Sequence, residues 1–145
     1  MAYKTASLIN PRLYRKLFFK YYRRIVDILR GAGIDILSLD SDGNVEELIP
    51  VWLDCGINYI WPMEVAAGMD VVQLRKRFGK ELLLGGGMDK RVLATSKTAI
   101  REMVDDKIHL MQEGGYIPGV DHAIPPDIPW ENFLYFRKLV AEVRP

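Results

Sequence analysis

The 145-residue sequence has one cysteine, Cys55, and two histidines, His109 and His122. A single cysteine cannot form a disulfide within the chain, which excludes a cystine framework and favours a reducing compartment. No apolar run approaches the ~20 residues that a membrane span requires, and the first residues lack the apolar core of a signal peptide. We therefore expect a cytoplasmic protein with no membrane partner.

The sequence also lacks an excess of either charge, because 20 Lys and Arg residues face 19 Asp and Glu residues. This balance argues against nucleic acid as a partner. Basic residues are concentrated in one helical pattern, which we interpret as a solvated helix face, with a stripe that binds phosphate or RNA as the alternative. The residues are Arg12, Arg15, Lys16, Lys20, Arg23, Arg24 and Arg30.

Apolar residues make up 49% of the chain, enough for one domain with a real core. Residues 1–10 show no periodic pattern and are predicted to be an N-terminal arm before a domain spanning residues 11–145. From Pro11, apolar residues recur at the spacing of an amphipathic helix that Gly31 and Gly33 end. These residues are Leu13, Leu17, Tyr21, Ile25, Ile28 and Leu29.

After this helix the pattern of strand, loop and helix occurs four times. The predicted strands are 34–39, 57–61, 82–84 and 116–120, and the helices that follow them are 45–53, 71–78, 98–113 and 130–143. Such alternation predicts an α/β fold with a parallel sheet and right-handed crossovers. The strands are mostly apolar, which is typical of burial on both faces. Alternation alone leaves open a doubly wound sheet or a barrel.

Polar residues follow the end of every predicted strand. Asp40 and Asp42 follow the first, Glu64 the second and Asp89 the third, and Asp121 and His122 follow the fourth. The carboxyl ends of parallel strands share one rim, which carries the chemistry of (β/α)8 barrels. The alternatives are a simple turn for the first two, helix caps for Glu64 and Asp89, and a hydrogen bond to loop backbone for His122.

The last exit loop contains three prolines, Pro125, Pro126 and Pro129, which restrict the backbone and lower the entropy lost on ordering. We expect Asp127 or Pro129 at the N-cap of the closing helix. A histidine beside an acid in a rigid loop is well placed to be oriented by its neighbour. Glycines 85–87 lack the spacing and lysine of a phosphate loop, so they indicate a tight strand exit.

Four stretches in register resemble the uroporphyrinogen decarboxylase superfamily, which includes tetrapyrrole decarboxylases and cobalamin-dependent methyltransferases. They are Asp40-Ser-Asp-Gly-Asn44, Pro62 to Asp70, Leu82-Leu-Leu-Gly-Gly-Gly-Met-Asp89 with Gly79, and Gly115 to Asn132. The resemblance covers residues 11–143. It implies the C-terminal half of a TIM (β/α)8 barrel that acts on a small-molecule substrate, as in porphyrin metabolism.

The resemblance also implies a site. His122 looks like the counterpart of a pocket histidine of the decarboxylases. With Asp121 and Glu64, which the strand exits place on the same rim, it makes up the predicted catalytic set. Predicted substrate contacts come from the other exits and are Asp40, Asp42, Asn44, Gly87 and Asp89. The sequence departs from the decarboxylases at Gly86-Gly-Met-Asp-Lys90, where they carry a Gly-Asn-Leu-Asp-Pro type of segment.

The methyltransferases of this superfamily hold zinc through a His-x-Cys pair and a later Cys, where this chain has Asp40, Asp42 and His122. Together with Glu64 these form a harder ligand set, which suits a divalent metal other than zinc, or no metal. A corrinoid supplied by a partner protein is the other cofactor that the resemblance implies.

We therefore predict part of a superfamily enzyme that performs corrinoid-linked methyl transfer or decarboxylation of a related substrate. The alternative is a non-catalytic half-barrel, serving as a binding or assembly subunit, or a truncated fragment without the N-terminal catalytic half. The barrel would be closed by a second copy as a homodimer or by an N-terminal half subunit, and a corrinoid protein is a further expected partner.

Overall fold

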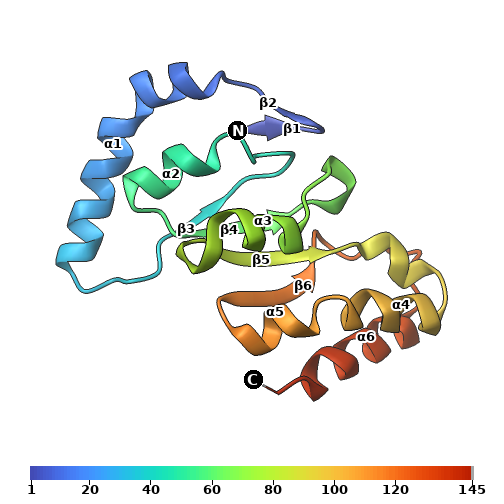
Figure 1. The fold of residues 1–145 in the computed structure, drawn as a ribbon. Coiled ribbons are helices and arrows are strands. Elements are labelled where there is room, and N and C mark those ends of the chain that lie inside the picture. The colour runs from blue at the N-terminus through green and yellow to red at the C-terminus, as the bar shows by residue number, and fades with distance from the viewer. Residues whose placement is uncertain (145) are drawn as a thin grey trace.

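The computed structural model describes residues 1–144 and has an α/β fold. A short antiparallel pair, β1 (Ala2–Tyr3) and β2 (Ala6–Ser7), precedes the long helix α1 (Pro11–Gly31), and four parallel strands alternating with helices follow (Figure 1). The strands are β3 (Ser38–Asp40), β4 (Tyr59–Met63), β5 (Leu83–Met88) and β6 (Tyr116–Val120). The helices are α2 (Ile49–Cys55), α3 (Val71–Phe78), α4 (Lys97–Asp105), α5 (Ile108–Glu113) and α6 (Trp130–Glu142), with 3-10 turns η1 (Val65–Ala67), η2 (Gly79–Glu81) and η3 (Lys90–Ala94).

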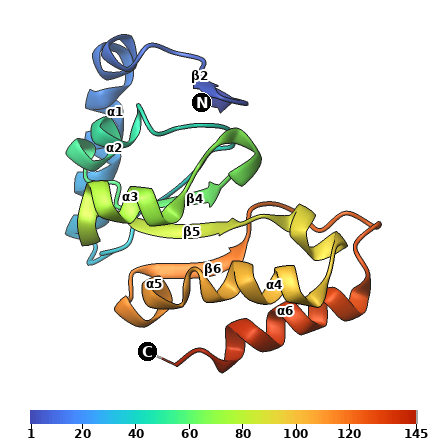
Figure 2. The ribbon, with the colours of Figure 1, turned by 45° about the vertical axis from the view of Figure 1, so that its right-hand side comes forward.

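The sheet has the order β3-β4-β5-β6, so neighbours in the sequence are neighbours in space and every pair is parallel. The predicted parallel sheet is confirmed. Right-handed crossovers that all advance in one direction place every connecting helix on the same face. Figures 1 and 2 show α1 and α2 beside the β3 end of the sheet and α4, α5 and α6 beside β6.

Only one face of the sheet is covered within residues 1–144. Leu39, Ile60 and Leu84 lie in one row of the register and are buried, whereas the next row exposes Asp40 and Trp61. The expectation that both faces are buried is therefore wrong for this part of the molecule. The strand composition misled because an aromatic such as Trp61 counts as apolar, although 43% of its surface is exposed.

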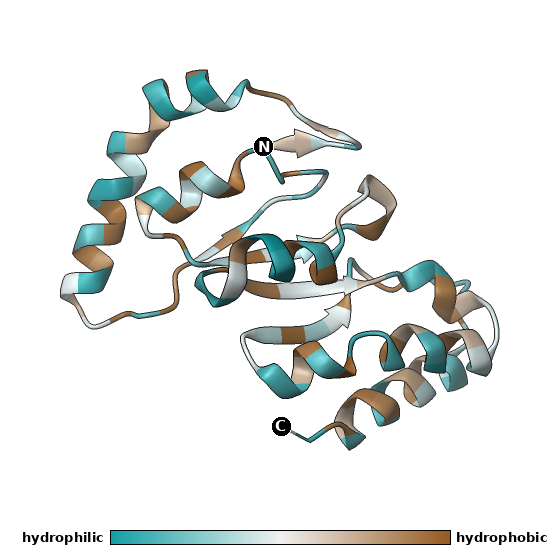
Figure 3. Ribbon diagram, in the orientation of Figure 1, coloured by the Kyte–Doolittle hydropathy of each residue, from teal (hydrophilic) through white to brown (hydrophobic). Residues whose placement is uncertain are grey.

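The first helix is amphipathic as predicted, but the predicted apolar stripe does not face the core. Its buried residues are Tyr14 and Val26, and Trp52 of α2 donates a 3.1 Å hydrogen bond from Nε1 to Tyr14 Oη. The predicted stripe lies one position before the buried one along the helix, and its side chains are 46–64% exposed. It consists of Leu13, Leu17, Tyr21, Ile25 and Ile28. Figure 3 shows hydrophobic and hydrophilic segments alternating along α1.

Several element boundaries differ from the prediction: β3 begins at Ser38 instead of residue 34, and α2 begins at Ile49 instead of residue 45. Two further differences concern β5 and the fourth predicted helix. The glycines 85–87 lie inside β5 rather than after it, and a Cβ at Gly85 would stand 2.2 Å from Tyr59 Oη, so any larger residue there would displace the Tyr59 side chain. The predicted helix 98–113 is broken into α4 and α5, with Asp106 and Lys107 between them. Apolar spacing continues across this break, so periodicity alone could not place it.

The amino ends of β5 and β6 are joined by Arg75, a buried residue of α3. Its guanidinium donates to four carbonyls at 2.9–3.4 Å, and its Nε lies 3.7 Å from Glu113 Oε2. The acceptors are Gly79, Leu82, Gly114 and Gly115. One buried cation thus satisfies the loops that lead into both strands.

The N-terminal arm packs against the rest of the chain. Asn44 donates its backbone N–H to Lys4 O at 2.7 Å, and a Cβ at Gly43 would lie 2.8 Å from the carbonyl carbon of Ala2. The arm thereby covers the exit loop of β3. Across residues 1–144 we find no helix with the length and apolarity that crossing a bilayer demands.

Candidate functional site at the carboxyl ends of the strands

The exit loops of β3 and β6, the two outer strands of the sheet, meet at a polar contact. His122 Nε2 lies 2.9 Å from Asp42 Oδ1, joining residues 80 positions apart in the sequence. The Asp42 side chain is 67% exposed and that of His122 is 26% exposed. An ionised carboxylate only accepts hydrogen bonds, so neutral His122 must carry its proton on Nε2 in this contact. Nδ1 has no hydrogen-bond partner within the described residues and can exchange a proton.

A cavity of about 270 Å³ lies beside this pair. Its walls come from the ends of β3, β4 and β6 and combine carboxylates with an aromatic ring. The lining residues are Asp40, Asp42, Trp61, Pro62, Val120, Asp121, His122 and Ala123. Predicted site residues from the first and fourth strand exits therefore line one cavity, with the exposed indole of Trp61 between them.

Asp121 holds the loops under the cavity rather than facing solvent, since only 1% of its surface is exposed. Its Oδ2 accepts from Val65 N at 3.2 Å and its Oδ1 from Lys90 N at 3.3 Å. Its own N–H donates to Met88 O at 2.9 Å. The carboxylate therefore ties the exits of β4 and β5 to β6, and it fixes the backbone next to His122. Its predicted role as a catalytic group has no support in these contacts.

Glu64 also connects two exit loops through a hydrogen bond. Its Oε2 accepts from Gly43 N at 2.7 Å, which links the exit of β4 to that of β3. It makes no side-chain cap at η1, and α3 is capped by Asp70 instead. Glu64 thus supports the loop that presents Asp42, and the cap alternative is wrong.

Asp89 caps η3, so the helix-cap alternative given for it above is confirmed. Its Oδ1 accepts from Arg91 N at 2.9 Å, and both carboxylate oxygens accept from the Arg91 guanidinium. The hydrogen bonds from the Arg91 side chain lower the pKa of Asp89 below its ordinary value, against the opposing effect of burial. The two oxygens are already engaged, and Asp89 does not line the cavity.

Asn44 and Gly87, both predicted substrate contacts, have structural partners. Asn44 Nδ2 donates to Ala67 O at 3.3 Å, and its Oδ1 accepts from Glu46 N at 3.1 Å. Gly87 has a φ of 73°, and a Cβ there would lie 2.4 Å from Val71 Cγ1. Glycine at this position lets β5 pack against α3.

The four predicted metal ligands, Asp40, Asp42, Glu64 and His122, do not converge. In the described part of the chain, no group of three or more His, Cys, Asp and Glu side chains lies close enough to hold one ion. Glu64 is turned to Gly43 N, and the other contact is the simple pair of Asp42 with His122.

Trp61 was missed as a site residue by the sequence interpretation. It was assigned only as the end of a strand, yet it lines the cavity. The alternation of Tyr59, Ile60 and Trp61 contained the signal, because buried Ile60 places both aromatic side chains on the opposite face.

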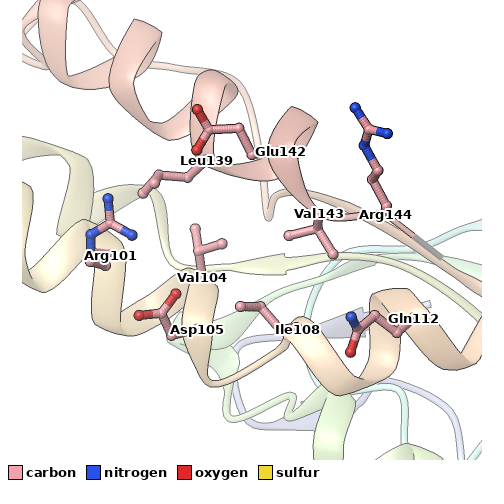
Figure 4. Close-up of a pocket in the computed structure, with 9 residues that line it drawn as sticks. All are labelled: Arg101, Val104, Asp105, Ile108, Gln112, Leu139, Glu142, Val143 and Arg144. Carbon is pink, nitrogen blue, oxygen red and sulfur yellow. The ribbon is translucent and has the colours of Figure 1, made fainter.

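A second cavity, about 440 Å³, lies between α4, α5 and α6 and contains none of the predicted site residues (Figure 4). Its apolar part includes Val104, Ile108 and Leu139, and charged residues such as Arg101 and Glu142 stand at its border. None of the residues that line it belongs to a strand exit.

Comparison with known proteins places these observations in a family. The family model described as uroporphyrinogen decarboxylase (URO-D) matches residues 2–143. Similar curated proteins include the uroporphyrinogen decarboxylase of Campylobacter lari, 29% identical over 94% of this chain and 39% of its own length. The enzymes of Legionella pneumophila strain Paris and Hordeum vulgare are 28% and 25% identical, over 96% of this chain and 39% and 41% of their lengths. The chain thus spans about two fifths of these relatives.

Proposed function

The chain belongs to the uroporphyrinogen decarboxylase family, and we propose that its strand exits provide the proton-transfer part of a decarboxylation site. The observation that carries the proposal is the 2.9 Å contact between Asp42 and His122 beside the cavity lined by Trp61. The rest of the site would come from polypeptide outside residues 1–145, which completes a barrel around the open face of the sheet.

Loss of CO2 breaks a carbon–carbon bond and leaves its electron pair on the substrate carbon, which must then take up a proton. Protonated His122 can donate its Nδ1 proton to that carbon while Nε2–H stays bonded to Asp42. The product is a C–H bond and a neutral imidazole in the tautomer that Asp42 selects. Asp42 orients the ring, and Glu64 and Asp121 hold the loops that carry the pair.

The relatives are named for uroporphyrinogen, which makes that compound the first substrate to test. The cavity fits one edge of a larger aromatic compound, since the Trp61 ring offers a flat apolar contact. Asp40 and Asp42 favour substrate N–H donors here and repel substrate carboxylates. The acidic groups of a substrate would therefore lie away from this edge.

Corrinoid-linked methyl transfer and a divalent metal stay predictions. A thiolate ligand or nucleophile is not provided by Cys55, which is buried at the end of α2, where burial raises the pKa of its thiol. Corrinoid binding at the cavity, measured by visible absorption, would favour methyl transfer over decarboxylation.

The test has two readouts. In the chain joined to the part of the L. pneumophila enzyme that it does not match, His122→Asn should reduce CO2 release from uroporphyrinogen by about 100-fold or more. Asp42→Asn should reduce it by about 10-fold. His109→Asn, at an exposed histidine of α5, is the matched control and should leave the rate unchanged.

The second readout needs no activity. Nitrogen-15 NMR of the chain alone should show neutral His122 protonated at Nε2, and this preference should weaken in Asp42→Asn. A His122 protonated at Nδ1, or full turnover by His122→Asn, would remove the pair from the mechanism.

A further inference from the structure

The cavity at the strand exits is acidic. Asp40, Asp42 and Asp121 line it, whereas no lysine or arginine of residues 1–144 does. Asp121 accepts hydrogen bonds from two backbone amides, and Asp42 Oδ1 contacts His122 Nε2. Asp40 differs from both, because its carboxylate makes no ion pair with residues 1–144. The cavity therefore has one carboxylate whose charge the described chain does not balance.

Trp61 stands directly beside this carboxylate. Asp40 and Trp61 are partners in the register of β3 and β4, so both side chains project from the open face of the sheet. Neighbouring strands lie about 4.8 Å apart, which places the carboxylate next to the indole ring. Lysine and arginine side chains lie over several other aromatic rings, but within residues 1–144 none lies over Trp61. The face of this ring is available to the cation of a ligand.

The remaining walls of the cavity are apolar and come from Pro62, Val120 and Ala123. A metal ion needs several oxygen or nitrogen ligands, and no suitable group of three side chains occurs in the described residues. A methylated ammonium group needs fewer polar partners, since its methyl groups make apolar contacts and its charge is attracted by an aromatic face. At about 270 Å³ the cavity is smaller than the pockets of about 300–1,000 Å³ that hold drug-sized ligands, so it fits one such group.

We infer that this cavity binds an N-methylated ammonium group of the substrate, with Trp61 against the methyl groups and Asp40 as the counter-ion. Tryptophan is the aromatic residue that attracts a cation most strongly, and quaternary ammonium groups are typical ligands of such rings. Asp42 stays paired with His122, so the carbon that receives the proton lies on the His122 side of the cavity. The substrate class is a carboxylic acid that carries a methylated ammonium group.

Charge, more than shape, distinguishes this ligand from a neutral one. A neutral apolar group of the same size would remove water from the Asp40 carboxylate without balancing its charge, which costs free energy. The cationic group balances the charge and makes the same apolar contacts. The cavity should therefore discriminate between two ligands that differ only in a nitrogen and a carbon atom.

The proposed function supplies the chemistry on which this inference rests, but ligand binding is measured without turnover. Nitrogen-15 NMR of the chain follows the Trp61 indole N–H during titration with choline and with its neutral isostere, 3,3-dimethylbutan-1-ol, at constant ionic strength. Choline should shift this signal and bind about 10-fold more tightly than the alcohol. Equal affinities would show that the cavity recognises shape alone, and no shift with choline would show that it binds no cation. Either result overturns the inference.

Substitution of the ring tests its part in binding, with the His122 ring signals as the readout. Trp61→Leu should weaken choline binding by about 10-fold, and Trp61→Phe should weaken it less, because an aromatic face remains. Trp130→Leu, at a tryptophan that is 68% exposed and does not line the cavity, is the matched control and should bind choline normally. Equal weakening in Trp61→Leu and Trp130→Leu would contradict a contact specific to the cavity.

Substitution of the counter-ion tests the charge. Asp40→Asn keeps the size of the side chain and should weaken choline binding by about 5-fold while leaving the affinity for the neutral alcohol unchanged. Asp127→Asn, at an exposed acid outside the cavity, is the matched control and should change neither affinity. If Asp40→Asn weakened both ligands equally, Asp40 would shape the cavity without acting as counter-ion, and the assignment would fall.

The cation site and the proton-transfer pair can fail separately. His122→Asn should keep choline affinity within about 2-fold, because the ammonium group lies against Trp61 and Asp40. The same variant should lose CO2 release in the joined protein described above. Choline binding combined with full turnover by His122→Asn would remove the pair from the mechanism and leave the cation site standing. Loss of CO2 release in that variant without any choline binding would have the opposite meaning.

Discussion

The two ends of the sheet are each held by one buried charge, and the two charges serve different purposes. At the amino ends, Arg75 donates to four backbone carbonyls, so one guanidinium group provides hydrogen bonds to the loops that lead into β5 and β6. At the carboxyl ends, Asp121 accepts from two backbone amides and leaves the neighbouring His122 free to contact Asp42. The amino end is closed and structural, whereas the carboxyl end supports the exposed pair of Asp42 and His122, to which we assign proton transfer.

The largest effect should come from the amino end. Arg75→Met removes a buried cation and leaves one buried and three part-buried carbonyls without their donor, and we expect a loss of about 3 kcal/mol in the free energy of unfolding. Urea denaturation measures it. The NMR signals of His122 should not move in this variant. A shift of those signals would show that the two ends are coupled and would break the comparison.

A smaller loss should follow from Asp121→Asn at the carboxyl end. One amide oxygen can still accept, but the NH2 group faces a backbone N–H, so we expect a loss of about 1–3 kcal/mol. Here the His122 signals should change, because the loop that carries it loses one anchor. Asp127→Asn, at an exposed acid of the same loop, is the control and should change neither quantity.

The smallest effect concerns Asp89, which caps η3 at the same rim. Asp89→Ala should cost about 1 kcal/mol through the lost cap. Because the folded-state pKa of Asp89 is lowered, its contribution is complete above the ordinary value of 3.8 and is lost as the pH falls below it. The stability difference between the two proteins should therefore shrink in acid, as chemical denaturation between pH 6 and about pH 2 would measure. A difference independent of pH would mean that the carboxylate charge has no part in the cap.

Particular residues show how far the sequence could lead. The four strands and their exits were predictable because Gly, Asp and Pro follow each apolar run, and the convergence of Asp42 and His122 follows from the shared rim of parallel strands. The assignment of Asp121, Glu64 and Asn44 to direct chemistry could not be judged, because a carboxylate or amide in a loop has the same sequence signature whether it binds substrate or backbone. Their hydrogen bonds to other exit loops give them positioning roles.

The spacing of apolar residues correctly predicted that α1 is an amphipathic helix. It could not show which side of the helix faces the core. Tyr14 and Val26 face α2, and the adjacent stripe from Leu13 to Ile28 faces outward. Both stripes are apolar, so periodicity cannot say which is buried. The same ambiguity concealed the open face of the sheet, since Trp61 contributes to apolar composition while exposing its ring beside the cavity.

By itself, the sequence determined the α/β class, the four strands of the parallel sheet and the family, because these depend on local periodicity and on short stretches of fixed spacing. Only the tertiary structure decided which polar residues anchor loops, which face of α1 is exposed within residues 1–144 and on which side β3 pairs there. Those properties depend on contacts between residues far apart in the chain, and hydrogen-bond partners and burial are fixed only when the strands are brought side by side.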